Sequence, residues 1–548
     1  MSKEKEQNII FTIMAVACII LFAFVVSPKT LQNDTYYTIA IGNYIYENGI
    51  SDLTQDVFSW HDIPYTYPHW LYDLGIYLIY RSFGQAGIYA STIIFTSILG
   101  LVIYMLCSKL SNNRVVSFII TLLSMWLIKP YIAARAQLVT FILFGLTVYS
   151  IEMFLQNHKK RYLVYLLIIP LLIANLHCAV FPFYFILYLP YIGEFLLEVL
   201  VDLDLDQRLY KLFFKIILKL TKKDSVKEKI NAKINSIQEK IEITKVKRQR
   251  LRENPYKIKV TKNFWVIPII IIMLLSVFTG LINPAGNGAY TYLYKTMKGN
   301  TTDSINEHQP LVLANSHEFL AAFVLFLSIL IFTDTKIKLS DLLMLIGLTA
   351  LAFKTKRQIS MFAIFCAPIL AKLIAAMFEK YDNKAYEKMM NFAGSVLGSC
   401  AIILSIALIA TDSLKSTVKS PYVDESSYPV AASDWMIANL DVKKMKLYNE
   451  YNYGSYLLFR GIPVFVDSRA DLYAPEFNGK KDIFSDALNI AGIALNYKTA
   501  FEDYGVTHVI TYANAKLAML LEDDSNYKKI YDDNSFKIFE KVVQKEGV

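Results

Sequence analysis

The chain has 548 residues and a net charge of +9; 55% of its residues are hydrophobic and 19% are charged. Soluble domains usually carry about 45–50% apolar and about 25% charged residues, and the apolar excess here is gathered in blocks with almost no charge. Many of these blocks approach the roughly 20 residues that cross a bilayer. This composition excludes a soluble globular enzyme, a secreted disulfide scaffold and a disordered chain, and it predicts a polytopic α-helical membrane protein.

The apolar blocks define a predicted membrane domain over residues 1–411. No cleavage signature follows the first block, so we expect a retained first span rather than a signal peptide. The block at 70–83 is short and carries Asp73 and Arg81. The blocks lie at approximately 8–26, 70–83, 86–107, 115–130, 136–155, 162–176, 178–200, 263–282, 317–333, 338–354, 358–377 and 391–411.

Basic loops indicate the orientation, because cytoplasmic loops are rich in Lys and Arg. If 70–83 crosses the membrane fully, the most basic loop falls outside. If 70–83 is a half-buried or re-entrant helix at the outer face, every strongly basic segment falls inside. These segments are 2–7, 109–114, 157–161 and 202–262. We adopt the second count, with about eleven crossings and a cytoplasmic N-terminus in a bacterial cell membrane. The expected external segments include 27–85, 283–316 and 412–548.

The cytoplasmic insert at 202–262 holds 18 basic and 8 acidic residues. Within it, 209–220 alternates an apolar face with Lys211, Lys215 and Lys219, which predicts an amphipathic interfacial helix with a cationic face for anionic lipid headgroups. Apolar residues at spacings of three and four over 226–252 predict a short coiled coil or a helical hairpin.

Residues 412–548 change character, since hydrophobicity falls and short β-branched or aromatic runs alternate with helical patterns. This alternation predicts a small external α/β domain tethered by the last span. The expected strands are 446–448, 463–466 and 507–511, and the expected helices are 431–440, 454–459 and 513–522. A hairpin is expected at 527–531 and 536–540, around the turn signal Asp533-Asn534.

Asp34 stands where the chain leaves the first span, and helical spacing follows it from Tyr37 to Ile45. We expect a juxtamembrane helix on the outer surface. Partial desolvation of an acid at such a boundary raises its affinity for a hydroxyl proton, which suits a general base. The alternative is that Asp34 caps the helix, because Asp is a favoured N-cap residue.

Three basic residues lie on the external side in the adopted topology, although basic residues are expected on the cytoplasmic side. Lys354, Lys356 and Arg357 fall in a short external loop. They indicate an anion site at the outer membrane face, or else interfacial snorkelling or a different topology. No histidine has metal-ligand spacing such as His-x-x-x-His, so no cofactor is expected; a divalent metal is not indicated but stays open. Nucleic acid is not an expected partner.

Several motifs together resemble a known superfamily. The pattern resembles the GT-C glycosyltransferases, which include protein O-mannosyltransferases, the lipid A aminoarabinose transferase and the catalytic subunit of oligosaccharyltransferase. The motifs are Asn33-Asp34-Thr35-Tyr36-Tyr37, Asp56-Val57-Phe58-Ser59, His69-Trp70-Leu71-Tyr72-Asp73, Asn283-Pro284-Ala285-Gly286, Ile305-Asn306-Glu307-His308-Gln309-Pro310, Lys356-Arg357, Asn449-Glu450-Tyr451, Gly454-Ser455-Tyr456-Leu457 and Pro463-Val464-Phe465-Val466-Asp467-Ser468-Arg469.

The resemblance implies transfer of a sugar, with inversion, from a polyprenyl-phosphate carrier to an envelope acceptor that is a polymer, a lipid or a protein. By analogy Asp34 is the general base. The implied donor-phosphate ligands are Lys354, Lys356, Arg357 and Arg135, which suit an anionic leaving group. The implied substrate-binding residues are Asp56, His69, Trp70, Asp73, Glu307 and His308, with Glu307 matching a second-loop acid of oligosaccharyltransferases.

The turn Tyr131–Gln137 departs from the pattern, since many relatives carry an Asp or an Asp-x-Asp pair there. This departure argues against a divalent-metal mechanism. Asp467 and Arg469 are expected to form a structural salt bridge at a strand end. A non-enzymatic role in transport or assembly of lipid-linked glycans is the alternative function. Transporters place ionisable residues at mid-membrane, whereas the polar residues here gather at the outer face, which favours an enzyme.

Overall fold

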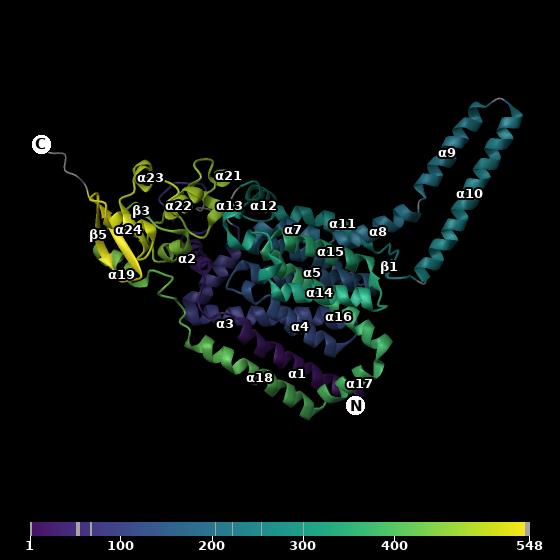
Figure 1. Cartoon of the computed structure of the whole chain (residues 1–548), viewed down its shortest axis with the longest axis horizontal. Coiled ribbons are helices and arrows are strands. Elements are labelled where there is room, and N and C mark those ends of the chain that lie inside the picture. Colours follow the sequence, from purple (N-terminus) through teal and green to yellow (C-terminus); the bar gives the residue numbers. More distant parts are fainter. Residues whose placement is uncertain are drawn as a thin grey trace.

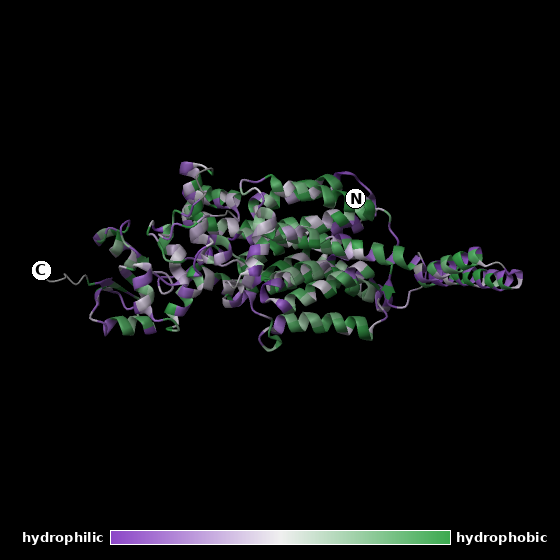
Figure 2. Ribbon diagram, turned by 90° about the horizontal axis from the view of Figure 1, so that it is seen from above, coloured by the Kyte–Doolittle hydropathy of each residue, from purple (hydrophilic) through white to green (hydrophobic). Residues whose placement is uncertain are grey.

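A computed structural model of the chain describes residues 3–50, 55–65, 68–202, 204–221, 223–253, 255–299 and 301–542. Long helices lie side by side in a bundle, with the C-terminal segment at one end and a helical hairpin projecting from the other (Figure 1). Hydrophobic residues run through the bundle, whereas the hairpin and the C-terminal segment are mixed in character (Figure 2). The fold is mostly helical, as the composition predicts.

Six helical segments among the described residues are long and apolar enough to cross a membrane. They are Glu4–Val26, Trp70–Ser111, Ala136–Asn157, Cys178–Leu220, Lys356–Tyr381 and Val396–Lys419. Four shorter apolar helices accompany them: Arg114–Leu127, Arg161–Leu176, Val266–Leu281 and His317–Phe332. The count of eleven crossings stays a prediction.

The helices of the first half follow the predicted blocks closely. They are α1 (Lys3–Val26), α2 (Asn33–Asn48), α3 (Trp70–Ser111), α4 (Arg114–Leu127), α5 (Ala136–Asn157), α6 (Arg161–Leu176), α7 (Phe181–Ile186) and α8 (Leu189–Asp202). Helix α3 contains both the short block 70–83 and the next span, joined at Gly84, whose φ of 60° and ψ of −153° break the helical geometry. Glycine adopts this conformation because it lacks a Cβ atom.

The insert forms an antiparallel hairpin of α9 (Leu205–Leu220) and α10 (Asp224–Glu253). The remaining helices of the bundle are α11 (Val266–Ser276), α12 (Gly288–Lys298), α13 (Thr301–Ser304), α14 (His317–Phe332), α15 (Leu339–Lys354), α16 (Ile359–Tyr381), α17 (Asn383–Ala393) and α18 (Val396–Lys419). Strands β1 (Ile258–Lys259) and β2 (Ile337–Lys338) pair in parallel beside the base of the hairpin. Helix α18 continues to Lys419, beyond the expected domain boundary at 411.

The C-terminal segment folds around a four-stranded mixed sheet in the order β3-β4-β6-β5. The strands are β3 (Leu447–Tyr448), β4 (His508–Tyr512), β5 (Tyr527–Asp532) and β6 (Phe536–Lys541). The helices are α19 (Val430–Asn439), α20 (Tyr451–Phe459), α21 (Pro475–Asn478), α22 (Ile483–Ala491), α23 (Tyr497–Tyr504) and α24 (Lys516–Glu522). The expected strand at 463–466 is wrong, because Val464 makes only an isolated bridge with Ser59.

Helix α2 lies between the bundle and the C-terminal segment and packs on both. The fully buried ring of Tyr36 has its centroid 5.0 Å from those of Tyr428 and Tyr456. On another side, α2 approaches α3 so closely that a Cβ atom on Gly42 would lie 2.1 Å from the carbonyl oxygen of Asp73. Only glycine fits this crossing, so Gly42 sets the position of the helix that carries Asp34.

Replacing Gly42 with alanine therefore has a predicted cost. Gly42→Ala forces α2 away from α3 and should lower the free energy of unfolding by about 1–3 kcal/mol, the usual effect of overpacking. Gly75→Ala is the matched control, because Gly75 lies within α3 and nothing surrounds its Cβ position. That variant should be neutral or gain up to about 1 kcal/mol from helix propensity. Unfolding in detergent measures both; equal stability of the two variants would contradict the close approach.

Candidate functional site

A cavity of about 1270 Å³ lies where the bundle meets the C-terminal segment. Its walls come from the start of α2, the start of α5, the 3₁₀ turn Cys178–Val180 with α7, the second large loop, the α15–α16 turn and the C-terminal segment. Seven of the predicted site residues line this cavity. They are Asp34, His69, Arg135, Glu307, His308, Lys354 and Arg357. The fold thus brings together residues that lie hundreds of positions apart in sequence.

Asp34 and Glu307 both form ion pairs with Arg135. Arg135 Nε lies 2.9 Å from Asp34 Oδ2, and its Nη1 lies 3.3 Å from Glu307 Oε1. Burial lowers the pKa of the Arg135 guanidinium, but the two carboxylates outweigh this and the pKa is raised. Arg135 therefore keeps its charge and forms ion pairs with both acids.

Asp34 does not cap α2. The N-cap residue is Gln32, which makes no capping hydrogen bond through its side chain. Asp34 lies in the first turn of the helix, where the positive end of the helix dipole stabilises a carboxylate. The capping interpretation is therefore wrong. The side chain of Asp34 is free of the backbone and points to Arg135, with about a quarter of its surface exposed (26%).

The three basic residues of the α15–α16 turn have different surroundings. Arg357 Nη2 donates a hydrogen bond to Gln137 Oε1 at 3.1 Å, and its Nη1 lies 3.5 Å from His308 Nε2. Burial and Arg357 both lower the pKa of His308, so this imidazole is neutral at neutral pH. Throughout the described ranges, no carboxylate lies within ion-pair distance of Arg357 or Lys354. Two cations that have no carboxylate partner among the described residues thus line the cavity, and such a wall attracts an anion.

Lys356 does not line the cavity. Its ammonium donates to Asn306 Oδ1 at 3.1 Å, and its carbonyl oxygen accepts a hydrogen bond from the Tyr131 hydroxyl at 2.6 Å. Its backbone N–H also donates to Gln309. Lys356 therefore fastens the turn to the second loop, and the wall described above contains Lys354 and Arg357 without it.

His69 connects the cavity to a buried acid. The Tyr37 hydroxyl lies 3.0 Å from His69 Nε2, and His69 Nδ1 lies 2.7 Å from Asp73 Oδ1. Burial lowers the pKa of His69, but Asp73 raises it, and the net direction is upward. Asp73 is 1% exposed, and neither Asp73 nor Trp70 lines the cavity. Trp70 instead donates from its indole to Asn175. Asp73 therefore holds His69, whereas Trp70 ties the start of α3 to α6.

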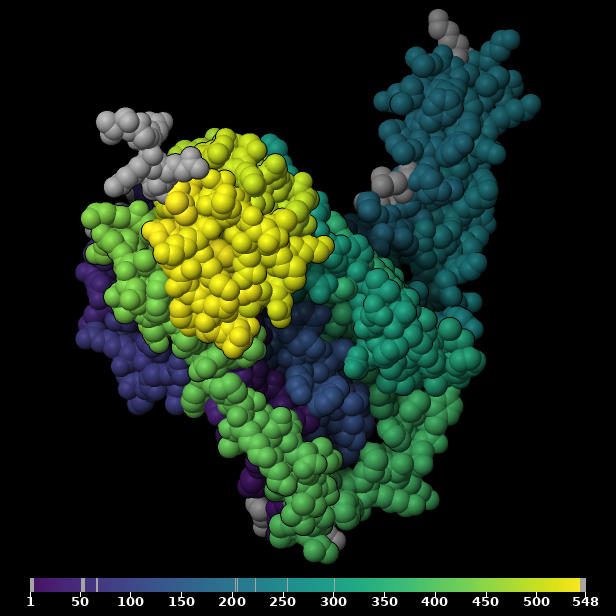
Figure 3. Space-filling model, turned by 60° about the vertical axis from the view of Figure 1, so that its left-hand side comes forward, coloured from purple at the N-terminus to yellow at the C-terminus, as the bar shows by residue number. Residues whose placement is uncertain are grey.

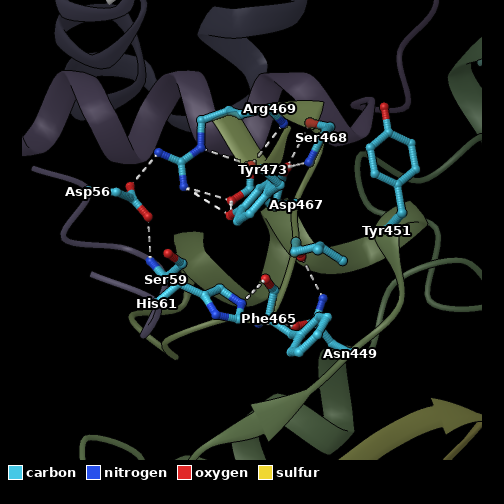
Figure 4. Close-up of polar contacts among 12 residues, drawn as sticks. Asp56, Ser59, His61, Asn449, Tyr451, Phe465, Asp467, Ser468, Arg469 and Tyr473 are labelled. Atoms are coloured by element: carbon cyan, nitrogen blue, oxygen red, sulfur yellow. Dashed lines mark hydrogen bonds and ion pairs between the residues drawn. The ribbon is translucent and has the colours of Figure 1, made fainter. Parts of the chain in front are cut away.

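Asp56 is buried in a cluster shown in Figure 4. Arg469 Nη1 lies 2.6 Å from Asp56 Oδ1, and its Nη2 lies 2.6 Å from Asp467 Oδ2. Tyr473 donates its hydroxyl proton to the same carboxylate of Asp467, and Asp56 also accepts from the backbone N–H of Ser59. The expected pair of Asp467 and Arg469 is present, and Asp56 joins it. Asp56 therefore ties the first loop to the C-terminal segment and does not reach the cavity.

Several cavity residues carried no predicted role. Gln137 orients Arg357, and His177 lies beside His69 with its Nδ1 2.8 Å from the Thr140 hydroxyl. The carboxylate of Asp471 accepts hydrogen bonds from Thr296 and Thr301 of the second loop. The role of Gln137 could have been suspected from the sequence, because a polar residue stands there at the start of an apolar block. The contacts of Asp471 depend on the fold, and no local sequence pattern indicates them.

The buried cluster predicts a large stability effect. Arg469→Met leaves two carboxylates without their counter-charge, and removing one partner from a buried ion pair costs about 3–5 kcal/mol. Arg460→Met is the matched control, because Arg460 pairs with Asp434, whose side chain is 62% exposed. An exposed pair contributes under about 1 kcal/mol. Thermal or urea unfolding compares the variants, and equal losses would contradict the structural role given to Arg469.

No protein-family model matches the chain, and no curated protein matches it. Solved structures do. An oligosaccharyltransferase from Archaeoglobus fulgidus tethered to an acceptor peptide with an NVT sequon matches with a TM-score of 0.52 and 12% identity, over 93% of this chain and 69% of that chain. Its apo form matches with a TM-score of 0.53 and 14% identity, over 92% and 69%.

A third match is the archaeal oligosaccharyltransferase AglB from the same organism, in complex with an inhibitory peptide and a dolichol-phosphate. The TM-score is 0.53 and the identity 13%, over 99% of this chain and 74% of that chain. The likeness therefore extends over both the helical bundle and the C-terminal segment. This chain has the GT-C fold of the oligosaccharyltransferases.

Proposed function

We propose that the chain is a membrane glycosyltransferase that moves a sugar from a polyprenyl-phosphate-linked donor to an acceptor in the cell envelope. The observation that carries the proposal is the composition of one cavity wall: a carboxylate at the start of α2 and cations from α5 and the α15–α16 turn face the same space. The acceptor is a glycan polymer, a lipid or a protein. The fold is that of enzymes of which one was solved with a dolichol-phosphate.

An apolar part of the cavity suits the donor's isoprenoid chain. It adjoins the cations and is formed by residues of four bundle helices. Burial of hydrocarbon against such a wall contributes roughly 0.8 kcal/mol per CH₂. The residues are Phe141, Phe144, Phe183, Ile186, Leu351 and Met361. A lipid phosphate beside Arg357 and Lys354 would then have its chain directed along the bundle.

The proposed reaction uses both the carboxylate and the cations that line the cavity. The acceptor hydroxyl oxygen attacks C1 of the donor sugar, the bond from C1 to the phosphate oxygen breaks, and its electron pair leaves on the polyprenyl phosphate. Asp34 takes the hydroxyl proton. Arg135, Lys354 and Arg357 stabilise the negative charge that develops on the phosphate, Arg through paired N–H donors and Lys as a point charge. Attack on the face opposite the leaving group gives inversion.

Ionisable residues within the bundle do not favour a transport path. Lys372 Nζ lies 2.6 Å from Asp341, and the Tyr191 hydroxyl donates to Glu152 at 2.9 Å. These groups satisfy one another and none of them lines the cavity. A translocation path usually exposes such residues to its substrate. The arrangement therefore favours transfer at one end of the bundle over passage through it.

Asp34→Asn should abolish transfer while the fold is retained. Removal of a general base costs about 10²–10⁴ in rate, and Asn keeps the size of the side chain while Glu307 still pairs with Arg135. Purified protein incubated with radiolabelled polyprenyl-phosphate sugars and envelope acceptors measures the rate, and the unfolding midpoint checks the fold. Full activity of the variant would remove Asp34 from the mechanism.

A donor-site variant separates binding from proton transfer. Arg357→Gln should raise the apparent KM for the lipid donor about tenfold or more, since a hydrogen bond to a charged group contributes about 1.5–3 kcal/mol. Its kcat should fall less than that of Asp34→Asn. An unchanged KM for the donor, with acceptor saturating, would place the phosphate away from Arg357.

The proposal places the cavity on the outer side of the membrane and the hairpin on the cytoplasmic side, and thiol labelling can measure this. In a Cys400→Ser background, which removes the one exposed native thiol, Thr355→Cys should react with a membrane-impermeant maleimide from outside intact cells. Asn231→Cys in the hairpin should react only after permeabilisation, because basic segments stay cytoplasmic. The reverse pattern would put the cavity on the cytoplasmic side and end the proposal of an outer-face reaction.

A further inference from the structure

The hairpin of α9 and α10 stands apart from the rest of the molecule, at the end of the bundle opposite the cavity (Figures 1 and 3). Helix α9 packs on α10 through one side only. Lys211 Nζ donates to Gln238 Oε1 at 2.5 Å, and Ile230 and Ile237 of α10 are buried. Among the described residues, α10 is the main element packed on α9, and the opposite side of α9 is exposed.

That free side of α9 is apolar. At 100° per residue its members fall within a sector of about 100°, and each leaves at least half of its surface exposed. They are Leu209, Leu212, Phe213, Ile216 and Leu220. A continuous apolar stripe of this length on a water-exposed helix is unfavourable unless something covers it.

Basic residues flank the apolar stripe. Lys215 and Lys219 are exposed on the neighbouring sector of α9. The whole hairpin, residues 205–253, holds 15 Lys and Arg against 6 Asp and Glu, a net charge of +9 that equals that of the entire chain. A surface that combines an apolar stripe with a cationic border is complementary to an anionic lipid leaflet.

The base of the hairpin is fixed to the end of α8. Arg252 lies 2.5 Å from both Glu198 and Asp202, and Arg248 lies 2.5 Å from Asp204. Asp204 has a left-handed φ of 42°, which ends α8 and redirects the chain into α9. These ion pairs hold the hairpin at a set angle to the bundle.

Helix α9 begins close to the end of a bundle helix, α8. Helix α8 has exposed leucines that face lipid in a bilayer, and α9 begins only three residues beyond its last residue. The exposed leucines are Leu196, Leu197 and Leu200. In Figure 1, α9 leads away from α8, and α10 runs back beside it to the end of the bundle near β1. With the bundle across a bilayer, α9 begins close to the surface at which α8 ends.

We propose that α9 is a membrane-surface anchor that binds an anionic leaflet, with the stripe of Leu209, Phe213 and Ile216 among the headgroups and Lys215 and Lys219 on the phosphates. The anchor holds the hairpin against the leaflet opposite the cavity. It does not depend on the proposed transfer reaction.

Fluorescence in nanodiscs tests the anchor with the full chain. Phe213→Cys in the Cys400→Ser background carries an environment-sensitive probe, in nanodiscs of phosphatidylcholine with or without phosphatidylglycerol. With the anionic lipid, the emission should shift to shorter wavelength and lose most of its intensity to a headgroup-level doxyl lipid quencher. Ser236→Cys, on the exposed side of α10 away from α9, is the matched control and should do neither.

A second experiment tests whether binding of α9 to the lipid depends on charge. Lys215→Gln with Lys219→Gln, in the Phe213→Cys protein, should reduce quenching in anionic nanodiscs, as should raised salt. A probe at 213 that stays in water in anionic nanodiscs would overturn the proposal. A probe that is shielded but not quenched by the lipid would overturn it too, since a second copy or another protein would then cover the stripe.

Discussion

The position of α2 is the constraint on which the site depends. This helix is buried on more than one side, with Tyr36 among the aromatic rings of the C-terminal segment and Gly42 against the backbone of α3. The Thr35 hydroxyl also donates to the carbonyl of Ala134, next to Arg135. A helix fixed at so many points cannot rotate, and its first turn therefore presents Asp34 to the cavity in a defined direction. Preorganisation of this kind is what a general base requires.

The cations of the cavity divide into two kinds by their partners. Arg135 is neutralised by Asp34 and Glu307, whereas Arg357 is held by the amide of Gln137 and a neutral His308. An amide and a neutral imidazole orient a guanidinium without cancelling its charge. Arg357 thus keeps its attraction for an incoming anion, while Arg135 also holds the carboxylate of Asp34 in place through an ion pair. The same residue type has two roles because its neighbours differ.

The sequence predicted much of the fold, because block length, periodicity and turn residues are local signals. The apolar blocks became the bundle helices, and the hairpin at Asp533-Asn534 formed as β5 and β6. The insert is helical, but 226–252 lies in the single helix α10, which pairs with α9 instead of forming a hairpin of its own. Long-range pairing was not readable. Residues 463–466 have a strand-like composition, but the neighbouring chain is the irregular first loop, so only one bridge forms. Asp34 looks like an N-cap in sequence; Arg135, a hundred residues away, decides its contact instead.

Proximity in sequence was also a poor guide to the direction of a side chain. Lys354, Lys356 and Arg357 were expected to act together, yet Lys354 ends α15 while Lys356 and Arg357 lie in a 3₁₀ turn, where neighbours point about 120° apart. Lys356 accordingly binds Asn306 and Arg357 faces Gln137. Asp56 was likewise expected at the site because of its motif. Its carboxylate is instead buried against Arg469, because a buried charge needs a partner of opposite charge.

The two ends of the bundle use positive charge in opposite ways. Around the cavity, a few cations lie in the wall, and Arg135 and Arg357 are each oriented by two neighbouring side chains, which suits one phosphate at a defined place. At the other end, many lysines point outward along a hairpin, exposed beside an apolar stripe, which suits a surface of many weakly held headgroups. A lone basic cluster in a sequence does not distinguish these cases. The distinction lies in geometry: convergence on a cavity selects a ligand, whereas divergence along a helix selects a membrane.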